Sequence, residues 1–242
     1  PFYVQEKVDG YNIRVIMVNN ELYAFSRSGY IEAFATEKLR EHNEIKRVAS
    51  NGYIICGEMI GNTPYTTSFQ HDDYEFFVFD IIKDGKFLET NEMYEIASKY
   101  GVNVVPFYGI FDPNDEKSIE ELKTLVKNLN REKKEGLVMK NHENRIKYVF
   151  GFNELLHFAN AFEAPFDFNI GYIQQRIFRA SLFFEEFNDK YYDKISEESK
   201  ALNPINYLRD SIEMFKKKGY VAKTFRIKVK ALTTWIDIIK RL

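Results

Sequence analysis

This sequence has very little cysteine and no marked excess of either charge. Cys56 is the only cysteine among 242 residues. This excludes an internal disulfide and a zinc site of the usual cysteine spacing, and it favours a reducing compartment, with the cytoplasm as the default. The formal net charge of −2 argues against a protein that coats nucleic acid non-specifically, because phosphate binding draws on a surplus of lysine and arginine. Local basic patches remain compatible with this balance.

Long apolar runs and several well-known signatures are also missing. No run reaches the roughly 18 apolar residues of a membrane-spanning helix, and no signal peptide is visible, so we expect no membrane partner. The sequence has no Walker loop, no dinucleotide fingerprint and no serine-nucleophile elbow. Its four histidines lack metal-ligand spacing. The chain starts inside an apparent strand without methionine, and we therefore expect that an N-terminal segment is missing.

The pattern of apolar residues changes between residues 151 and 165. Before this boundary, β-rich runs predict a hairpin that turns at Asn19-Asn20, and a later strand that turns at Asp84-Gly85. Further strands are expected at 53–61, 75–82, 135–140 and 145–150, and helices at 31–50, 91–99 and 118–130. Ser118 and Glu121 predict a capping box for the last of these helices.

Beyond the boundary, apolar residues recur at helical spacing, in the segments 154–162, 171–187, 205–217 and 221–242. The sequence therefore predicts two domains. Residues 1–152 form an α+β domain with a mainly antiparallel sheet, and residues 153–242 form an all-helical domain.

The first candidate for chemistry is Lys7, in the stretch EKVDGYNIR. Gly10 interrupts what otherwise looks like a strand, and such a glycine often marks a place where something approaches the backbone closely. A lysine amine becomes a nucleophile when neighbouring cations or desolvation free its lone pair. A surface lysine in a chance Lys-x-Asp-Gly string is the alternative explanation.

Two glutamates at strand ends are the next candidates. Glu58 lies in CGEMIG and Glu135 in KEGLVMK, where each could equally be solvated or salt-bridged. Mg²⁺ binds one or two such carboxylates together with substrate phosphates. Lys140 closes the strand that Glu135 opens, and Lys147 follows on the next strand.

The stretch FFVFDI supplies a candidate aromatic side chain. Strand alternation would place Phe77 and Phe79 on one face, and Phe76, Val78 and Asp80 on the other. Core packing is the simpler explanation for any one phenylalanine, but a ring at a strand end can also stack on a purine. We take Phe79 as the candidate. Arg27, in the turn SRSG, is suited to binding a phosphate, or is simply solvated.

Read in order, EKVDGYNIR, SRSG, GE, FFVFDI, EGLVMK and RIKYV resemble the motif series of the covalent nucleotidyltransferases, which comprise DNA ligases, RNA ligases and mRNA capping enzymes. The resemblance covers residues 6–149. It implies an antiparallel nucleotidyltransferase fold in which Lys7 attacks the α-phosphate of ATP, releases pyrophosphate and forms lysyl-AMP. It also implies Mg²⁺ or Mn²⁺ as the metal.

The resemblance implies a role for each matching residue. Asn12 and Glu58 would bind the ribose, Phe79 would stack on adenine, and Arg27 would lie near phosphate. Glu135 would bind the metal, while Lys140 and Lys147 would meet the phosphates. Glu6 and Val8 would flank the base, largely through their backbone. The last motif usually reads Lys-x-Lys, and Arg145 replaces its first lysine here, which leaves the role of that position open.

The predicted helical region, residues 153–242, indicates which members of this superfamily the sequence resembles most. DNA ligases and capping enzymes continue with an OB-fold of short strands, whereas this sequence continues with helices. The stretches KYVFGFNELLHF and IGYIQQRIFRASLFFEEF resemble the helical C-terminal region of the archaeal homodimeric, circularising RNA ligases. That similarity implies an RNA substrate with 5′-phosphate and 3′-hydroxyl ends, which the enzyme joins within or between molecules. It also implies a homodimer formed through residues 153–242. Another polynucleotide ligase, a capping-type enzyme or a non-catalytic RNA-binding scaffold are the alternatives.

Overall fold

The computed structural model describes residues 1–64, 73–132, 134–150, 217–218 and 228–241. The helices predicted between residues 154 and 216 lie outside this part of the chain. Two compact units divide the protein. The first contains Pro1–Lys7, Tyr108–Lys140 and Asn144–Lys223, and the second contains Val8–Phe107, Asn141–Glu143 and Thr224–Leu242.

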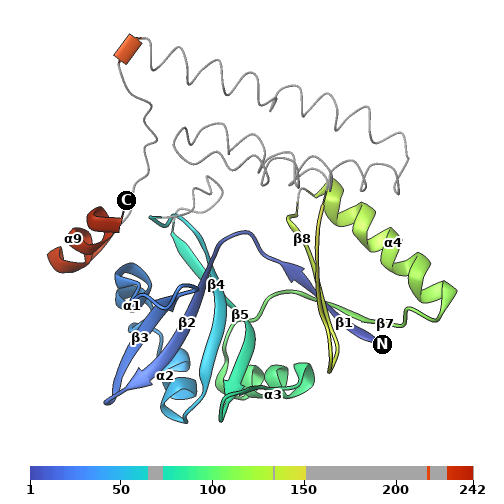
Figure 1. Ribbon diagram of the computed structural model, residues 1–242, viewed down its shortest axis with the longest axis horizontal. Coiled ribbons are helices and arrows are strands. Elements are labelled where there is room, and N and C mark those ends of the chain that lie inside the picture. The colour runs from blue at the N-terminus through green and yellow to red at the C-terminus, as the bar shows by residue number, and fades with distance from the viewer. Residues whose placement is uncertain (65–72, 133, 151–216, 219–227, 242) are drawn as a thin grey trace. The chain divides into compact units, whose positions relative to one another are not determined.

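The second unit is built on a five-stranded antiparallel sheet with the order β3-β2-β4-β5-β6 (Figure 1). Its strands are β2 (Tyr11–Val18), β3 (Glu21–Ser26), β4 (Ile54–Gly61), β5 (Tyr74–Lys83) and β6 (Lys86–Phe87). The two predicted hairpin turns are confirmed. Asn19, Asn20 and Asp84 have φ of 49°, 62° and 50°, and Gly85 has φ of 75°, as two-residue turns between twisted strands require.

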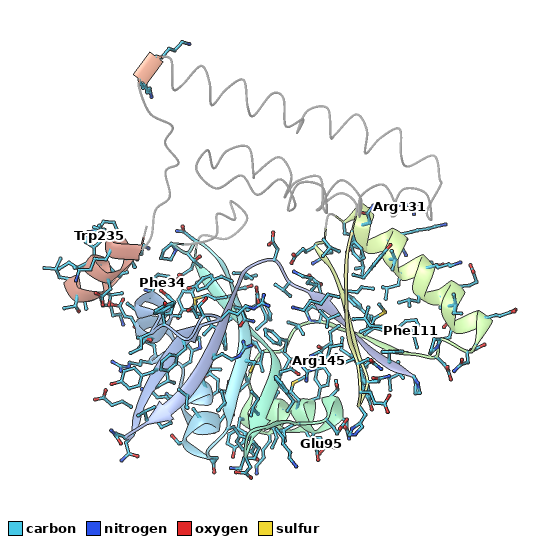
Figure 2. All side chains as sticks on the ribbon, in the orientation of Figure 1. Phe34, Glu95, Phe111, Arg131, Arg145 and Trp235 are labelled. Carbon is cyan, nitrogen blue, oxygen red and sulfur yellow. The ribbon has the colours of Figure 1, made fainter. Side chains whose placement is uncertain are left out.

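Helices cover one face of this sheet. They are α1 (Ala33–Leu39), α2 (Asn43–Ser50), α3 (Thr90–Tyr100) and α9 (Leu232–Arg241). Apolar residues of the strands, such as Ile13, Val15 and Val78, form one buried core with Phe34 of α1 and Ile238 of α9. Figure 2 shows Phe34 on α1.

The segment 31–50 forms two helices where one was predicted. Arg40 and His42 stand between them, and the side chain of Arg40 is anchored outside the helix, since its Nε donates to the carbonyl oxygen of Leu22 at 2.9 Å. His42 then has extended backbone angles as the N-cap of α2. A tertiary contact to β3 thus ends the first helix.

The first unit contains a four-stranded sheet with the order β7-β1-β8-β9. Its strands are β7 (Phe107–Phe111), which the sequence did not predict, β1 (Phe2–Lys7), β8 (Gly136–Lys140) and β9 (Arg145–Val149). Helix α4 (Glu116–Arg131) packs on one face, where Val126 and Leu129 join Val4, Leu137 and Phe150 in a second buried core. No helix in the described residues is both long enough and apolar enough to cross a membrane.

The capping box predicted at Ser118 is wrong. Helix α4 begins one turn earlier than expected, with Asp115 as its N-cap, and the side chain of Asp115 accepts from the backbone N–H of Lys117. The hydroxyl of Ser118 instead accepts from the backbone N–H of Asp112 at 2.8 Å. A capping box does occur in α3, between Glu89 and Glu92.

The stretch EKVDGYNIR is not one strand. Lys7 is the last residue of β1 and Tyr11 is the first of β2, in different sheets, and residues 8–10 connect them. Gly10 does mark a close approach, but the neighbour in this structure is a strand. A Cβ at Gly10 would lie 2.3 Å from the carbonyl oxygen of Met59 in β4.

Candidate functional site

Lys7 and Glu135 meet at the end of β1. The register pairs Lys7 with Gly136, the first residue of β8, and Glu135 precedes that strand directly. The Lys7 ammonium donates to Oε1 of Glu135. The Lys7 side chain is 24% exposed and that of Glu135 is 5% exposed, so a largely buried carboxylate holds a partly accessible amine.

A second ion pair lies beside the first. Glu6 precedes Lys7, and Lys134 precedes Glu135; Nζ of Lys134 lies 3.3 Å from Oε1 of Glu6. The acidic–basic sequence Glu6-Lys7 thus forms two ion pairs with the basic–acidic sequence Lys134-Glu135. The Tyr108 hydroxyl also donates to Glu6, at 2.5 Å. Burial, together with this hydrogen bond and the charges of Glu6 and Glu132, raises the pKa of Tyr108 well above its ordinary value of 10.0.

The predicted phosphate-binding lysines lie on the same sheet, at unequal separations from Lys7. The register pairs Lys147 with Val138, and Lys140 with Arg145. Lys140 is four residues from Gly136, about 13 Å of strand rise, whereas Val138 is two residues away. Lys147 and Arg145 are exposed and Lys140 is buried. Figure 2 shows Arg145 on β9.

Gly136 explains how β9 approaches this site. A Cβ at Gly136 would lie 2.1 Å from the carbonyl oxygen of Tyr148, a separation that two such atoms cannot adopt. Glycine therefore permits the pairing of Gly136 with Val149 and, through it, fixes β9 beside the strand that Glu135 opens.

The second unit carries its own set of predicted residues. The register aligns Asn12 of β2 with Glu58 of β4, and Glu58 with Phe77 of β5. These three side chains are half-buried, and by strand alternation they lie on the face opposite the helices, since Ile13 and Met59 belong to the core. Arg27 is exposed and follows Ser26, the partner of Ile13, so it lies at the end of the sheet that carries Asn12.

A β-bulge changes the alternation predicted for FFVFDI. Cys56 pairs with Asp80 and Gly57 with Val78, so Phe79 is the extra residue. Val78 and Ile81 are three residues apart and both belong to the core. The alternation of side chains between the two faces of the sheet must therefore shift by one residue between them. Asp80 therefore shares a face with Phe77, and its predicted place beside Phe76 and Val78 is wrong.

The bulge also affects the candidate aromatic residue. Phe79 is half-buried and occupies the bulge, while Phe77 is the residue in register with Glu58. Strand alternation predicted both phenylalanines on one face, and only Phe79 was taken as the candidate. Phe77 now stands beside it as a candidate.

Arg14 was missed by the sequence analysis. It lies two residues after Asn12 on β2, and its Nη1 donates to Oδ1 of Asn12. Lys134 and Tyr108 were missed as well. Spacing on a strand could have indicated Arg14, whereas the contact between Tyr108 and Glu6 spans 102 positions and left no local signal.

The same residues offer few ligands for a metal ion. The described residues contain no group of three or more His, Cys, Asp or Glu side chains arranged around a common ion position. A lone carboxylate such as Glu135 is compatible with Mg²⁺, which commonly binds through one or two carboxylates and completes its shell with water and phosphate oxygens.

Comparisons with known proteins identify the family and the fold. Residues 1–152 match the model of the RNA ligase family. A solved structure from Aquifex aeolicus, provisionally named an ATP-dependent DNA ligase, superposes with a TM-score of 0.90 at 31% identity, over 99% of this chain and 68% of that one. An archaeal ATP-dependent RNA ligase superposes with a TM-score of 0.87 at 26% identity, over 99% of this chain and 67% of that one.

The fold is therefore that of the nucleotidyltransferase-type ligases. The chain belongs to the RNA ligase family, as its motif series predicted. An uncharacterized protein of Methanocaldococcus jannaschii is 31% identical over 199 residues. The match covers 77% of this chain and 50% of that protein, so the chain spans half the length of this curated relative.

Proposed function

We propose that this chain is the adenylylating part of an ATP-dependent RNA ligase, with Lys7 as its nucleophile. The observation that carries the proposal is the contact between the Lys7 ammonium and the buried Glu135 carboxylate, at the paired ends of β1 and β8. The similarity to an archaeal ATP-dependent RNA ligase supports it.

The proposed first step forms one bond and breaks one. After its ammonium loses a proton, Nζ of Lys7 attacks the α-phosphorus of ATP, and the bond from that phosphorus to the bridging oxygen of the β-phosphate breaks. Pyrophosphate leaves and lysyl-AMP remains. The AMP then passes to an oxygen of an RNA 5′-phosphate, which frees Lys7, and a 3′-hydroxyl displaces AMP to seal the strand.

Glu135 is proposed to hold Lys7 before attack and to bind Mg²⁺ or Mn²⁺ afterwards. A hard cation at this carboxylate would offset the charge of the ATP phosphates when bound. Lys147 and Lys140, with Arg145, are proposed to offset the same charge on the phosphates, where Arg145 presents a planar fork in place of a point charge.

The remaining residues are proposed to bind the nucleoside. Asn12 and Glu58 bind the ribose, Phe79 or Phe77 stacks on adenine, and Arg27 contacts phosphate. Glu6 and Val8 flank the base through their backbone. For Glu6 this fits the structure, because its carboxylate already binds Tyr108 and Lys134.

The finer features of the family also belong to the proposal. We propose that the protein is cytoplasmic and that it forms a homodimer through residues 153–242. We also propose that it joins or circularises RNA with 5′-phosphate and 3′-hydroxyl ends. Size-exclusion chromatography with light scattering checks the dimer, and a ligation assay with a labelled 5′-phosphorylated RNA separates circles from linear products.

The first experiment is an intact-mass measurement after incubation with ATP or GTP and Mg²⁺. We expect the mass to increase by one AMP with ATP, and no increase in Lys7→Ala. Lys117→Ala is the matched control, because this side chain is 83% exposed on α4. A GMP adduct would instead indicate a capping-type enzyme, and no adduct with either nucleotide would indicate a non-catalytic RNA-binding scaffold.

A second experiment tests Glu135. Glu135→Gln keeps the shape but removes the charge that holds Lys7, and we expect the rate of lysyl-AMP formation to fall at least roughly tenfold, about 1.4 kcal/mol of transition-state stabilisation. Glu116→Gln, on an exposed residue of α4, serves as the control. A wild-type rate in Glu135→Gln would remove Glu135 from the mechanism.

A second candidate function differs in the nucleic acid that accepts the AMP. The Aquifex aeolicus structure carries a provisional DNA ligase name, so DNA is the alternative acceptor. Matched RNA and DNA oligonucleotides with 5′-phosphates, offered to the preformed adduct, decide between them by which one becomes adenylylated.

A further inference from the structure

The contact between Arg14 and Asn12 fixes which way the Asn12 amide faces. A guanidinium group carries hydrogen-bond donors and no acceptor, so its partner on Asn12 must be the carbonyl oxygen Oδ1. The oxygen of the amide is thereby engaged by Arg14. The N–H₂ group becomes what Asn12 offers to a ligand.

Glu58 offers the complementary group on the neighbouring strand. It is the Cα partner of Asn12, which places the two side chains on the same face, with Cβ atoms about 5 Å apart. An ionised carboxylate only accepts hydrogen bonds, and its two oxygens have about four acceptor sites. Glu58 can therefore accept from a ligand in addition to the contacts it already makes.

A hydroxyl group matches this pair, because its oxygen accepts while its hydrogen is donated. A donor from Asn12 and an acceptor from Glu58 would satisfy both functions of one hydroxyl at once. A hydrogen atom in the place of that hydroxyl would satisfy neither, and half-buried polar groups left without a partner weaken binding.

We propose that Arg14 is a positioning residue that makes Asn12 a hydrogen-bond donor, so that Asn12 and Glu58 together select the 2′-hydroxyl of ATP over 2′-deoxyATP. The selection rests on the proposed function, because it assumes that this face binds the ribose of the nucleotide. Arg14 itself does not touch the nucleotide in this arrangement. Its effect is to hold the amide in one of its two orientations.

The test measures equilibrium binding of ATP and 2′-deoxyATP by calorimetry, in a Lys7→Met protein so that no covalent step intervenes. We expect ATP to bind roughly tenfold more tightly than 2′-deoxyATP, as one charge-assisted hydrogen bond would give. In Arg14→Gln the ratio should fall to about twofold, through weaker binding of ATP and little change for 2′-deoxyATP. Arg14→Lys retains a donor to Oδ1 and should keep part of the preference.

Two further proteins make the result specific. Because Arg14 acts through Asn12, adding Arg14→Gln to Asn12→Ala should not lower the ratio further. Arg40→Gln is the matched control, since Arg40 contacts Glu21 and the carbonyl oxygen of Leu22 in the same unit, and it should leave the ratio unchanged.

Three outcomes would overturn the inference. Equal affinity of the Lys7→Met protein for both nucleotides would show that no 2′-hydroxyl is selected. An equal loss of both affinities in Arg14→Gln would show that Arg14 contacts a phosphate or supports the fold. No binding of either nucleotide would remove the ribose from this face. The ligase proposal is judged separately, by the AMP adduct on wild-type protein.

Discussion

The five-stranded sheet and the four-stranded sheet carry their candidate residues in different positions. In the five-stranded sheet, Asn12, Glu58 and Phe77 lie within strands, aligned by the register of three neighbours. In the four-stranded sheet, Lys7 ends β1 and Glu135 precedes β8, where ion pairs hold the side chains.

The residues proposed to bind the nucleoside and the residue proposed to react thus lie in different structural settings. Asn12 and Glu58 lie within strands whose ladder continues before and after them, so their side chains start from a fixed position. The ladder between β1 and β8 ends at Lys7, and the Lys7 side chain is held by its ion pair with Glu135. We therefore expect the proposed nucleophile to exchange its partner more readily than the groups proposed to bind the nucleoside.

The largest expected effect comes from the two glycines that permit close strand approach. A Cβ would meet a carbonyl oxygen at 2.1 Å at Gly136 and at 2.3 Å at Gly10. Gly136→Ala and Gly10→Ala should each lower the free energy of unfolding by about 1–3 kcal/mol, measured by urea denaturation. Gly85→Asn is the control, because a type I′ turn accepts asparagine. A wild-type midpoint for Gly136→Ala would contradict the packing of β9 against β8.

A smaller effect is expected where α9 meets α1, on the covered face of the five-stranded sheet. The Glu37 carboxylate accepts from the backbone N–H groups of Lys230 at 2.6 Å and Ala231 at 3.0 Å. It thereby caps a helix almost 200 positions away. Glu37→Ala should cost about 1 kcal/mol, as the loss of a cap does, and hydrogen exchange should increase in residues 232–241. Glu95→Ala, on an exposed residue of α3, is the control.

The same contact predicts an acid dependence. Burial alone would raise the pKa of Glu37, but hydrogen bonds from Lys230, Thr234 and Ala231 outweigh burial and lower it. A lowered pKa in the folded state means that Glu37 stabilises the protein above its ordinary pKa of 4.5. This stability is lost as the pH falls through the lowered value. Exchange in α9 should therefore increase in acid in wild type, and much less so in Glu37→Ala.

Each sheet has one tyrosine that provides an alkaline comparison. Burial, with the charges of Glu41, Asp73 and Glu44, raises the pKa of Tyr74 to about 12, while the pKa of Tyr108 is raised in the first unit. A raised pKa stabilises the folded state below the ordinary value of 10.0, and this stability is lost as the pH rises towards about 12. In Tyr74→Phe the stability of the second unit should depend less on pH in this range, followed by circular dichroism. An unchanged profile would remove Tyr74 from the alkaline transition.

The smallest effect is expected for the partly exposed pair of Glu6 and Lys134. The Lys134 side chain is 40% exposed, and such pairs contribute about 1 kcal/mol or less. Lys134→Met should therefore change stability little. If the pair helps to align Lys7 with Glu135, the rate of lysyl-AMP formation should fall more than stability does. If Lys134→Met and Glu6→Gln each lower the rate of lysyl-AMP formation, and their effects add in the double variant, the two residues act separately.

Much of the fold could be predicted because its signals are local. Asn19-Asn20 and Asp84-Gly85 are residue pairs that adopt positive φ, so they identify both hairpins. The split of the segment 31–50 was not predictable from periodicity, because it depends on the contact of Arg40 with β3. Strand β7 has a glycine, Gly109, with φ of 126°, and it lacks the alternation that marks a strand.

The candidate site could be predicted only as far as its motifs extended. Lys7 and Glu135 were candidates from their positions in the sequence and received their roles from the resemblance, whereas their contact across 128 positions came from the structure. The position of Asp80 was wrong because a bulge, where Gly57 lies close to Phe76, breaks the two-residue period. Tyr108 and Lys134 carry no motif, so their contacts with Glu6 became visible only when β1, β7 and β8 were paired.

The reversed order of charges in Glu6-Lys7 and Lys134-Glu135 restricts how this protein can vary. If Lys7 is the nucleophile, the polarity of its pair with Glu135 is set by chemistry and cannot be inverted. The pair of Glu6 and Lys134 has no such chemical requirement, but the Glu6 carboxylate also accepts from the Tyr108 hydroxyl, and exchanging Glu6 with Lys134 would lose this hydrogen bond. Reversing the charge of only one residue would place two like charges together. We therefore expect that neither ion pair can be inverted, the first because of its chemistry and the second because of its contact with Tyr108.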